Sequence, residues 1–144
     1  MNPLIVLYTY EHLSIAPIQV LLAQGRAATE RRTVQRALAL LEQQGREAER
    51  TGMPWRHIKA LALQALAYQA LGTMTQSLIV LEQALVLAAP EGYVRIFLDE
   101  GAPMLALLRQ AAARGIMPGY VRTLLAGGGE VAPTRDPSRV DAGA

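Results

Sequence analysis

The sequence predicts an all-α fold of about six or seven helices, and three observations support this prediction. Ala, Leu, Gln, Glu and Arg dominate residues 12–126, and these residue types favour helices. Gly and Pro recur between the apolar runs, where they end one helix and open the next. Several sequence features also recur at a spacing of 40 residues, which indicates a repeated helix pair.

The first strongly amphipathic helix is expected within residues 29–50, TERRTVQRALALLEQQGREAER. Its apolar stripe consists of Val34, Leu38, Leu41, Gly45 and Ala48. The opposite face carries Arg32, Arg36, Gln43, Arg46 and Arg50. Glu42 and Arg46 are spaced to form an i,i+4 pair. Gly52 suits a left-handed helix end and Pro54 suits the first turn of the next helix, so two helices should meet there.

The next helix, WRHIKALALQALAYQAL at residues 55–71, is apolar around most of its circumference and therefore needs neighbours on more than one side. Gly72 and Thr73 provide a turn, the following helix is MTQSLIVLEQALVLAA, and Pro90 closes it. Polar residues interrupt both segments well short of the roughly 18 apolar residues of a membrane span, so no membrane contact is expected.

The stretch EGYVRIFLDEGAPM, residues 91–104, differs from its surroundings. Its alternation would suit a strand, but no second strand is available to pair with it, so a short helix with an Arg95–Asp99 pair is predicted. Gly92 and Gly101 would be its joints. Asp99 and Glu100 diverge by about 100° on a helix and lack a nucleophile or metal set beside them, so they are not expected to act as an acid/base pair.

Two short helices should follow, MLALLRQAAAR after Pro103 and GYVRTLLAG after Pro118.

The sequence contains an internal repeat, because the tripeptide LEQ occurs at residues 41–43 and again at 81–83. This spacing of 40 residues falls within the range for the length of one helix pair in tetratricopeptide-like and related α-solenoids. Gly25 and Gly72 are 47 apart, which places seven extra residues near 27–33. The predicted organisation is a domain at 1–126, with repeat units at about 13–52 and 54–92 and capping helices at 93–126, and a flexible tail or linker at 127–144.

The composition argues against several classes of function. The chain has no Cys and only two His, so no metal site and no cofactor are expected, and no catalytic residue is identified. Thirteen of the 14 basic residues are Arg, but they form no single run, so direct nucleic-acid binding is not expected. The apolar N-terminal patch at Leu4–Tyr8 lacks the features of a signal peptide, and a cytoplasmic location is expected.

Two candidate surfaces can be named from the helix positions. One is a ligand or partner surface on the inner helix of the second repeat, made of Trp55, Arg56, Lys59 and Tyr68. Core packing is an equal alternative for Trp55 and is favoured for Tyr68. The other is a self-association surface made of Met74, Ile79 and Val86, which lie where a capping helix would carry charge.

Residues 61–115, LALQALAYQALGTMTQSLIVLEQALVLAAPEGYVRIFLDEGAPMLALLRQAAARG, resemble the end of the tetratricopeptide-like sensor region of MalT-like, LuxR-type ATP-dependent transcriptional regulators of bacteria. PEGYVRIFLDEG carries most of this resemblance, and LSIAPIQVLLAQGR at Leu13–Arg26 extends it. In such regulators an ATP-binding module precedes the sensor region and a helix-turn-helix domain follows it. These 144 residues contain no GxxxxGK[ST] phosphate loop.

The resemblance implies a signal-receiving or protein-interaction segment of such a regulator, without catalytic activity of its own. Its expected partners are neighbouring domains of a regulator or a second copy of the chain, and a small-molecule effector is a further candidate. The alternative is a stand-alone helical scaffold or oligomerisation module with no small-molecule ligand.

Overall fold

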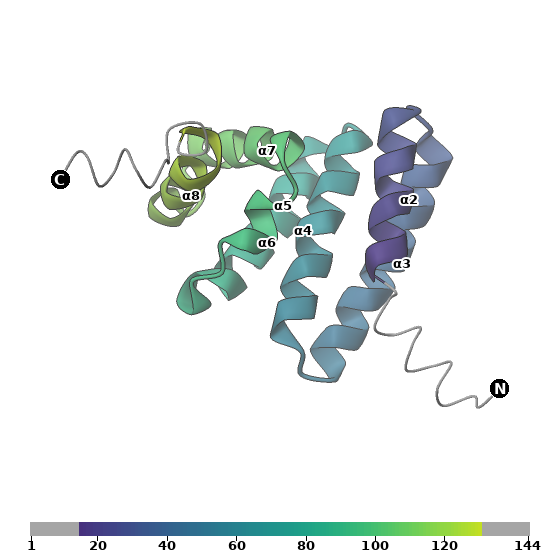
Figure 1. The fold of residues 1–144 in the computed structure, drawn as a ribbon, viewed down its shortest axis with the longest axis horizontal. Coiled ribbons are helices and arrows are strands. Elements are labelled where there is room, and N and C mark those ends of the chain that lie inside the picture. Colours follow the sequence, from purple (N-terminus) through teal and green to yellow (C-terminus); the bar gives the residue numbers. More distant parts are fainter. Residues whose placement is uncertain (1–14, 131–144) are drawn as a thin grey trace, which may run out of the picture. The chain divides into compact units, whose positions relative to one another are not determined.

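The computed structural model describes residues 15–130, and this part of the chain contains helices and turns but no strand (Figure 1). The helices are α2 (Ile15–Ala27), α3 (Arg31–Arg50), α4 (Pro54–Ala70), α5 (Met74–Ala88), α6 (Arg95–Leu98), α7 (Ala102–Ala113) and α8 (Pro118–Leu125), with a 3₁₀ turn at Ala89–Glu91 and a π-helical turn at Ala126–Glu130. The predicted all-α fold is confirmed. The N-terminal patch at Leu4–Tyr8 and most of the predicted tail lie outside the described residues.

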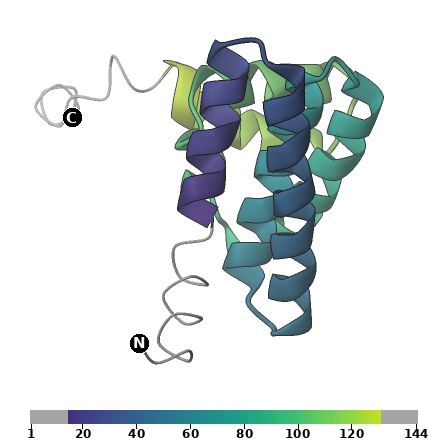
Figure 2. The same ribbon diagram turned by 90° about the vertical axis from the view of Figure 1, so that its right-hand side faces the viewer.

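The chain divides into two compact units, the first ending at Leu87 and the second beginning at Ala88. In the first unit, α2 packs against α3, and α3 packs against α4 (Figures 1 and 2). Every residue from Ala60 to Ala67 on α4 is buried. A helix that is buried around its whole circumference needs neighbours on several sides, as the sequence predicts.

Within the described residues of the first unit, side-chain hydrogen bonds to main-chain carbonyls join the helices. Gln64 Nε2 on α4 donates to the carbonyl of Leu41 on α3 at 3.2 Å, and Ser77 Oγ on α5 donates to the carbonyl of Ala65 on α4 at 2.6 Å. Both side chains are buried, so these bonds satisfy polar groups that would otherwise be costly. Arg31 Nη1 donates to the carbonyl of Leu71 at 3.2 Å, just after the C-terminal end of α4. The helix dipole makes this end partly negative, so it attracts a cation.

The turns between the helices agree with the predicted glycine positions except at the first one. Gly52, which follows the C-cap residue Thr51 of α3, has a φ of 68°, as predicted. Gly25, in contrast, lies inside α2, where an added Cβ would come within 2.9 Å of Val34 Cγ2. The left-handed residue of the first turn is Thr29, with a φ of 55°. Gly25 therefore permits close packing of α2 on α3 and does not form the turn.

This correction changes the size of the predicted insertion. The left-handed positions Thr29 and Gly52 are 23 residues apart, whereas Gly72 and Gly92 are 20 apart. Between corresponding turns, the first repeat (about 13–52) is therefore three residues longer than the second repeat (about 54–92), rather than seven.

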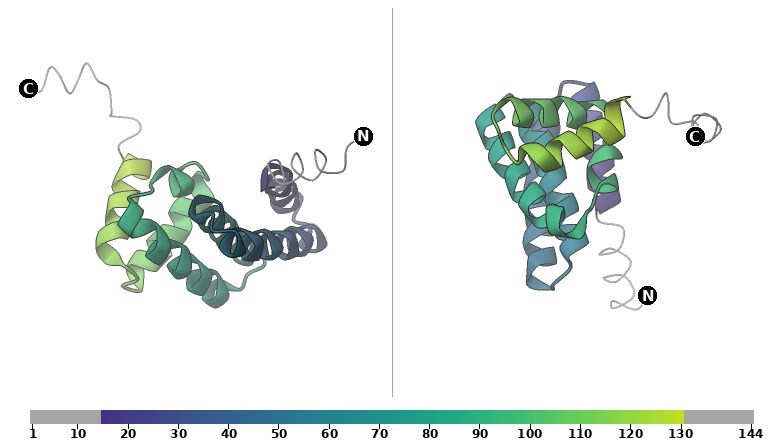
Figure 3. Two further views of the ribbon diagram at one scale, coloured as in Figure 1. Left: turned by 90° about the horizontal axis from the view of Figure 1, so that it is seen from below. Right: turned by 90° about the vertical axis from the view of Figure 1, so that its left-hand side faces the viewer.

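In the second unit, the stretch 91–104 contains the predicted short helix, α6, between Gly92 and Gly101, which both have a positive φ. Arg95 Nε lies 3.1 Å from Asp99 Oδ1, which confirms the predicted i,i+4 pair. Helices α7 and α8 then pack side by side (Figures 1 and 3). Pro103 lies in the first turn of α7 and Pro118 opens α8, as predicted.

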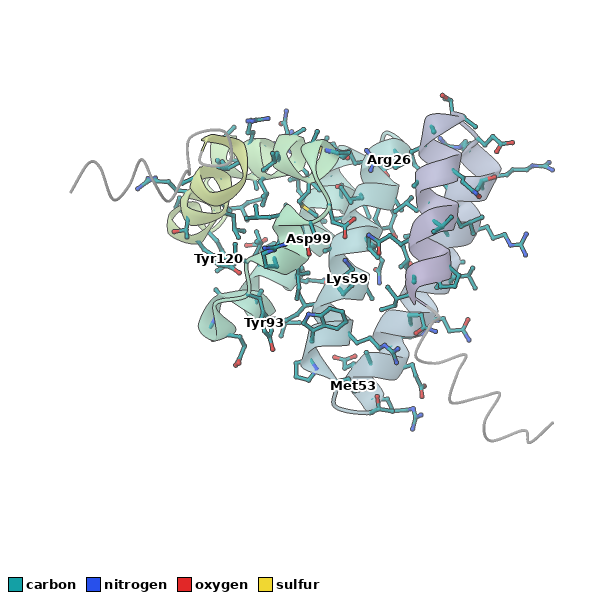
Figure 4. All side chains as sticks on the ribbon, in the orientation of Figure 1. Arg26, Met53, Lys59, Tyr93, Asp99 and Tyr120 are labelled. Atoms are coloured by element: carbon teal, nitrogen blue, oxygen red, sulfur yellow. The ribbon has the colours of Figure 1, made fainter. Side chains whose placement is uncertain are left out.

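The core of the second unit forms around Phe97, whose side chain is fully buried. Its ring meets that of Tyr120 edge to face, with the ring centroids 6.4 Å apart. The Tyr120 hydroxyl donates a hydrogen bond to the Tyr93 carbonyl, and both residues are labelled in Figure 4. The only Phe of the chain therefore fixes α6 against α8 rather than forming part of a loop site.

None of the helices within residues 15–130 is long and apolar enough to cross a membrane.

Candidate functional site

An open groove lies between α3 and α5 in the first unit, with α4 as its floor, and it has a volume of about 780 Å³. We call it the α3–α5 groove. Its lining residues are Glu42, Gly45, Arg46 and Glu49 from α3, His57, Leu61 and Gln64 from α4, and Ile79, Glu82, Gln83, Val86 and Leu87 from α5. This volume is within the range of sites that bind small molecules.

The helical period places these side chains on the groove. On α3, Glu42 and Glu49 are seven residues apart and therefore lie on one face of the helix, about 10 Å apart along its axis. On α5, Ile79 and Val86 have the same spacing. Consecutive helices joined by short turns run antiparallel, so α3 and α5 run in the same direction and their faces are matched along the groove.

Gly45 sets how closely α3 approaches the floor of the groove. A Cβ at this position would lie 3.1 Å from Gln64 Nε2 and 3.6 Å from the Ala60 Cβ. The missing side chain therefore lets α3 pack tightly on α4, and it leaves room for the Gln64 amide to reach the carbonyl of Leu41.

The wall formed by α5 is unusually apolar for an exposed surface. Ile79, Val86 and Leu87 are 47%, 53% and 43% exposed, whereas Leu61 below them is buried. Exposed large apolar side chains that are grouped on one face commonly mark an interaction surface.

The charges around the groove are mainly negative. Glu42, Glu49 and Glu82 face it together with one cation, Arg46. Among residues 15–130, no ion pair joins Glu42 to Arg46, so the pair predicted from the sequence does not form. The Glu42 carboxylate instead accepts a hydrogen bond from the Tyr68 hydroxyl, with Oε2 3.3 Å from the hydroxyl oxygen.

The hydroxyl of Tyr68 is harder to ionise than that of a free tyrosine. Partial burial is the largest cause of its raised pKa, and the negative charge of Glu42 and its hydrogen bond add to it. Burial alone raises the pKa of Tyr120 in the second unit. Both phenols therefore remain neutral donors for the acceptors that they contact.

An absorbance titration should show Tyr68 and Tyr120 ionising at higher pH in the folded chain than in the unfolded chain. The unfolded pKa is near 10.0 and the folded pKa values are raised, so the folded state holds these protons more tightly. Their contribution to the free energy of unfolding is complete below pH 10.0 and decreases as the pH rises through the folded pKa values.

The double variant with Tyr68→Phe and Tyr120→Phe should lack the delayed ionisation and lose less stability above that pH. If it retains the delayed ionisation, other tyrosines are responsible and the assignment is wrong.

The four residues of the candidate ligand surface all lie on α4, but none of them lines the α3–α5 groove. Trp55 is 53% exposed in the first turn of α4, near the α3–α4 turn marked by Met53 in Figure 4, so it is not part of the core. Arg56 and Lys59 are half-buried. Tyr68 is half-buried too, and reaches the groove only through Glu42.

The residues of the candidate self-association surface are divided by the structure. Ile79 and Val86 are exposed on the apolar wall of the groove, whereas Met74 is half-buried and does not line it. The sequence reasoning missed Glu49 and Glu82 as members of the same site. A signal for them was present, since Glu42 and Glu82 occupy equivalent positions of the 40-residue repeat and Glu49 lies two turns after Glu42.

Within residues 15–130, no group of three or more His, Asp or Glu side chains is arranged to hold a metal ion. Asp99, considered from the sequence as half of an acid/base pair, is exposed and bound to Arg95. The groove itself offers apolar side chains and carboxylates.

Comparison with known proteins agrees with this description. A family model described as the MalT-like TPR region, where TPR denotes the tetratricopeptide repeat, matches residues 5–114. A search of curated proteins and a search of solved structures each found no match. The family match covers well over half of the chain, and the described part of the matched segment consists of helices joined by turns. The chain therefore belongs to the MalT-like TPR family.

Proposed function

We propose that this chain is a signal-receiving or protein-interaction segment of a LuxR-type transcriptional regulator and that it catalyses no reaction itself. Membership of the MalT-like TPR family supports a regulatory role, since TPR-like domains generally mediate protein interactions. As part of a transcriptional regulator, it would act in the cytoplasm. The ATP-binding and DNA-binding functions would belong to other modules of the regulator, so this segment would not contact nucleic acid directly.

The α3–α5 groove is the observation that carries this proposal. It places exposed Ile79 and Val86 beside carboxylates that have no ion-pair partner among the described residues. Such a surface gains stability when a partner removes its apolar side chains from water, at about 25 cal/mol per Å² of apolar area. A signal that changes the occupancy of this surface could then be passed to neighbouring domains.

A thermal-shift screen with small-molecule effectors and with purified modules of LuxR-type regulators tests the proposal. A molecule that binds only the folded chain should raise the melting temperature, because it stabilises that state by about 2.7 kcal/mol at one hundred times its Kd. The shift should disappear in Val86→Arg, which blocks the groove. It should persist in Val20→Arg, a matched control on α2 with 55% exposure outside the groove.

The alternative function is a scaffold or oligomerisation module without a small-molecule ligand, and exposed Ile79 and Val86 favour it as well. Sedimentation in the same experiment separates the two functions. Two results together would replace the regulatory proposal by this alternative. The chain would form a dimer at micromolar concentration, and the double variant Ile79→Glu with Val86→Glu would dissociate it without unfolding the chain. In addition, no effector or module would give a thermal shift.

A further inference from the structure

We propose that the α3–α5 groove binds a helical segment of a partner protein that carries an apolar stripe with Lys or Arg side chains beside it. This inference rests on the proposed protein-interaction function and specifies the chemistry of the partner.

The apolar stripe of the partner follows from the wall formed by α5. Ile79 and Val86 stand two helical turns apart, and Leu87 lies next to Val86, above the buried Leu61 of the floor. A partner helix that presents apolar residues at positions i, i+3 or i+4, and i+7 has an apolar stripe as long as the distance between Ile79 and Val86. Such a helix could cover all three exposed side chains at once.

The basic side chains of the partner follow from the charge of the groove. Three carboxylates and one guanidinium line it, which gives a formal charge of −2 with His57 neutral, although the whole chain has a formal charge of +2. Within the described residues, Glu49 and Glu82 take part in no ion pair. They lie on opposite walls, so a cation between them would interact with both.

A helical partner fits this groove better than an extended one. An extended peptide gains affinity by pairing its main chain with the edge of a sheet. Here both walls and the floor are helices, whose main-chain groups are already bonded within each helix. In this open groove the amides of an extended peptide would stay bonded to water and add little affinity, whereas a helix satisfies its amides internally and binds through its side chains.

The test uses the full chain and a fluorescein-labelled helical peptide of about 16 residues, with Leu on one stripe and Lys on the flanking positions. Fluorescence anisotropy should show micromolar binding that weakens as salt is added. A second peptide with Glu in place of Lys, and a third with the Leu and Lys order scrambled, should each bind at least about tenfold more weakly.

Matched variants locate the binding surface. Glu49→Gln combined with Glu82→Gln should weaken binding of the Lys peptide by about tenfold, and Val86→Asn should do the same. Glu47→Gln is the control for charge, since Glu47 lies on α3 outside the groove and is paired with Arg50. Val20→Asn is the control for the apolar wall. Both controls should leave the affinity within about twofold.

The inference is overturned if the Glu or scrambled peptide binds as well as the Lys peptide, or if the groove variants match their controls. It is also overturned if the chain forms a dimer through the groove that the Lys peptide does not displace, since the occupant is then a second copy. If the Lys peptide does not bind but a regulator module still raises the melting temperature in a way that Val86→Arg abolishes, only the proposed partner chemistry is rejected. If neither the peptide binds nor any module or effector raises the melting temperature, the proposed function is rejected as well.

Discussion

Replacing Leu81 with alanine should lower the free energy of unfolding by about 2–5 kcal/mol, the range for removing a fully buried leucine side chain. Leu81 lies in the middle of α5 and has no exposed surface. The variant loses the apolar contacts of the side chain and leaves a cavity that the surrounding helices fill only in part. Urea denaturation followed by circular dichroism measures the change through a lower midpoint at an unchanged slope.

Ile79→Ala is the matched control, because Ile79 lies two residues away on the same helix and is 47% exposed in the α3–α5 groove. Its loss should change stability by no more than about 0.5 kcal/mol. Equal effects of the two substitutions would mean that Ile79 is buried in solution. That outcome would remove the apolar wall on which the proposed groove depends.

The helix boundaries could be predicted because they depend on local chemistry. Gly52 adopts the left-handed conformation that a helix end requires, and Pro118 opens α8 as its fixed φ allows. A short helix in residues 91–104 could be predicted for a different reason, because no other stretch of the sequence could pair with a strand there. The burial of α4 on all sides followed from its composition.

The position of the first turn could not be predicted in this way. The repeat spacing treats Gly25 as the counterpart of the turn residue Gly72, but its role is to let Val34 pack against α2, and this contact depends on tertiary structure. The turn itself uses Thr29, a residue type that gives little signal for a positive φ. Glycine in a sequence indicates either backbone freedom or close packing, and only the fold distinguishes them.

The candidate site was predicted only in part for a related reason. Exposed Ile79 and Val86 could be identified on one helix, because the helical period places them together. The grouping of Glu49 with Glu82 depends on α3 and α5 lying on either side of α4, which the sequence pattern does not specify residue by residue. The predicted Glu42–Arg46 pair does not form, and Glu42 instead accepts a hydrogen bond from Tyr68 of another helix, a contact that helical spacing alone does not indicate.

Replacing Phe97 with alanine should destabilise the second unit by about 3–5 kcal/mol, as expected for loss of a fully buried phenylalanine. The ring contacts Tyr120 edge to face, and the Tyr120 hydroxyl bonds to the Tyr93 carbonyl. Removing the ring therefore removes core volume and the support that orients Tyr120. Hydrogen exchange of the amides in α7 and α8 should show the loss of protection directly.

Arg95→Ala provides the control on the same short helix. Its ion pair with Asp99 is exposed, and such pairs typically contribute less than about 1 kcal/mol, so protection in α7 and α8 should change little. Phe97→Leu should recover part of the loss, because leucine refills most of the cavity without the edge-to-face contact. If Phe97→Ala changes exchange no more than Arg95→Ala does, then Phe97 is not the centre of this core. The stretch 91–104 would in that case be a mobile joint rather than the centre of a core.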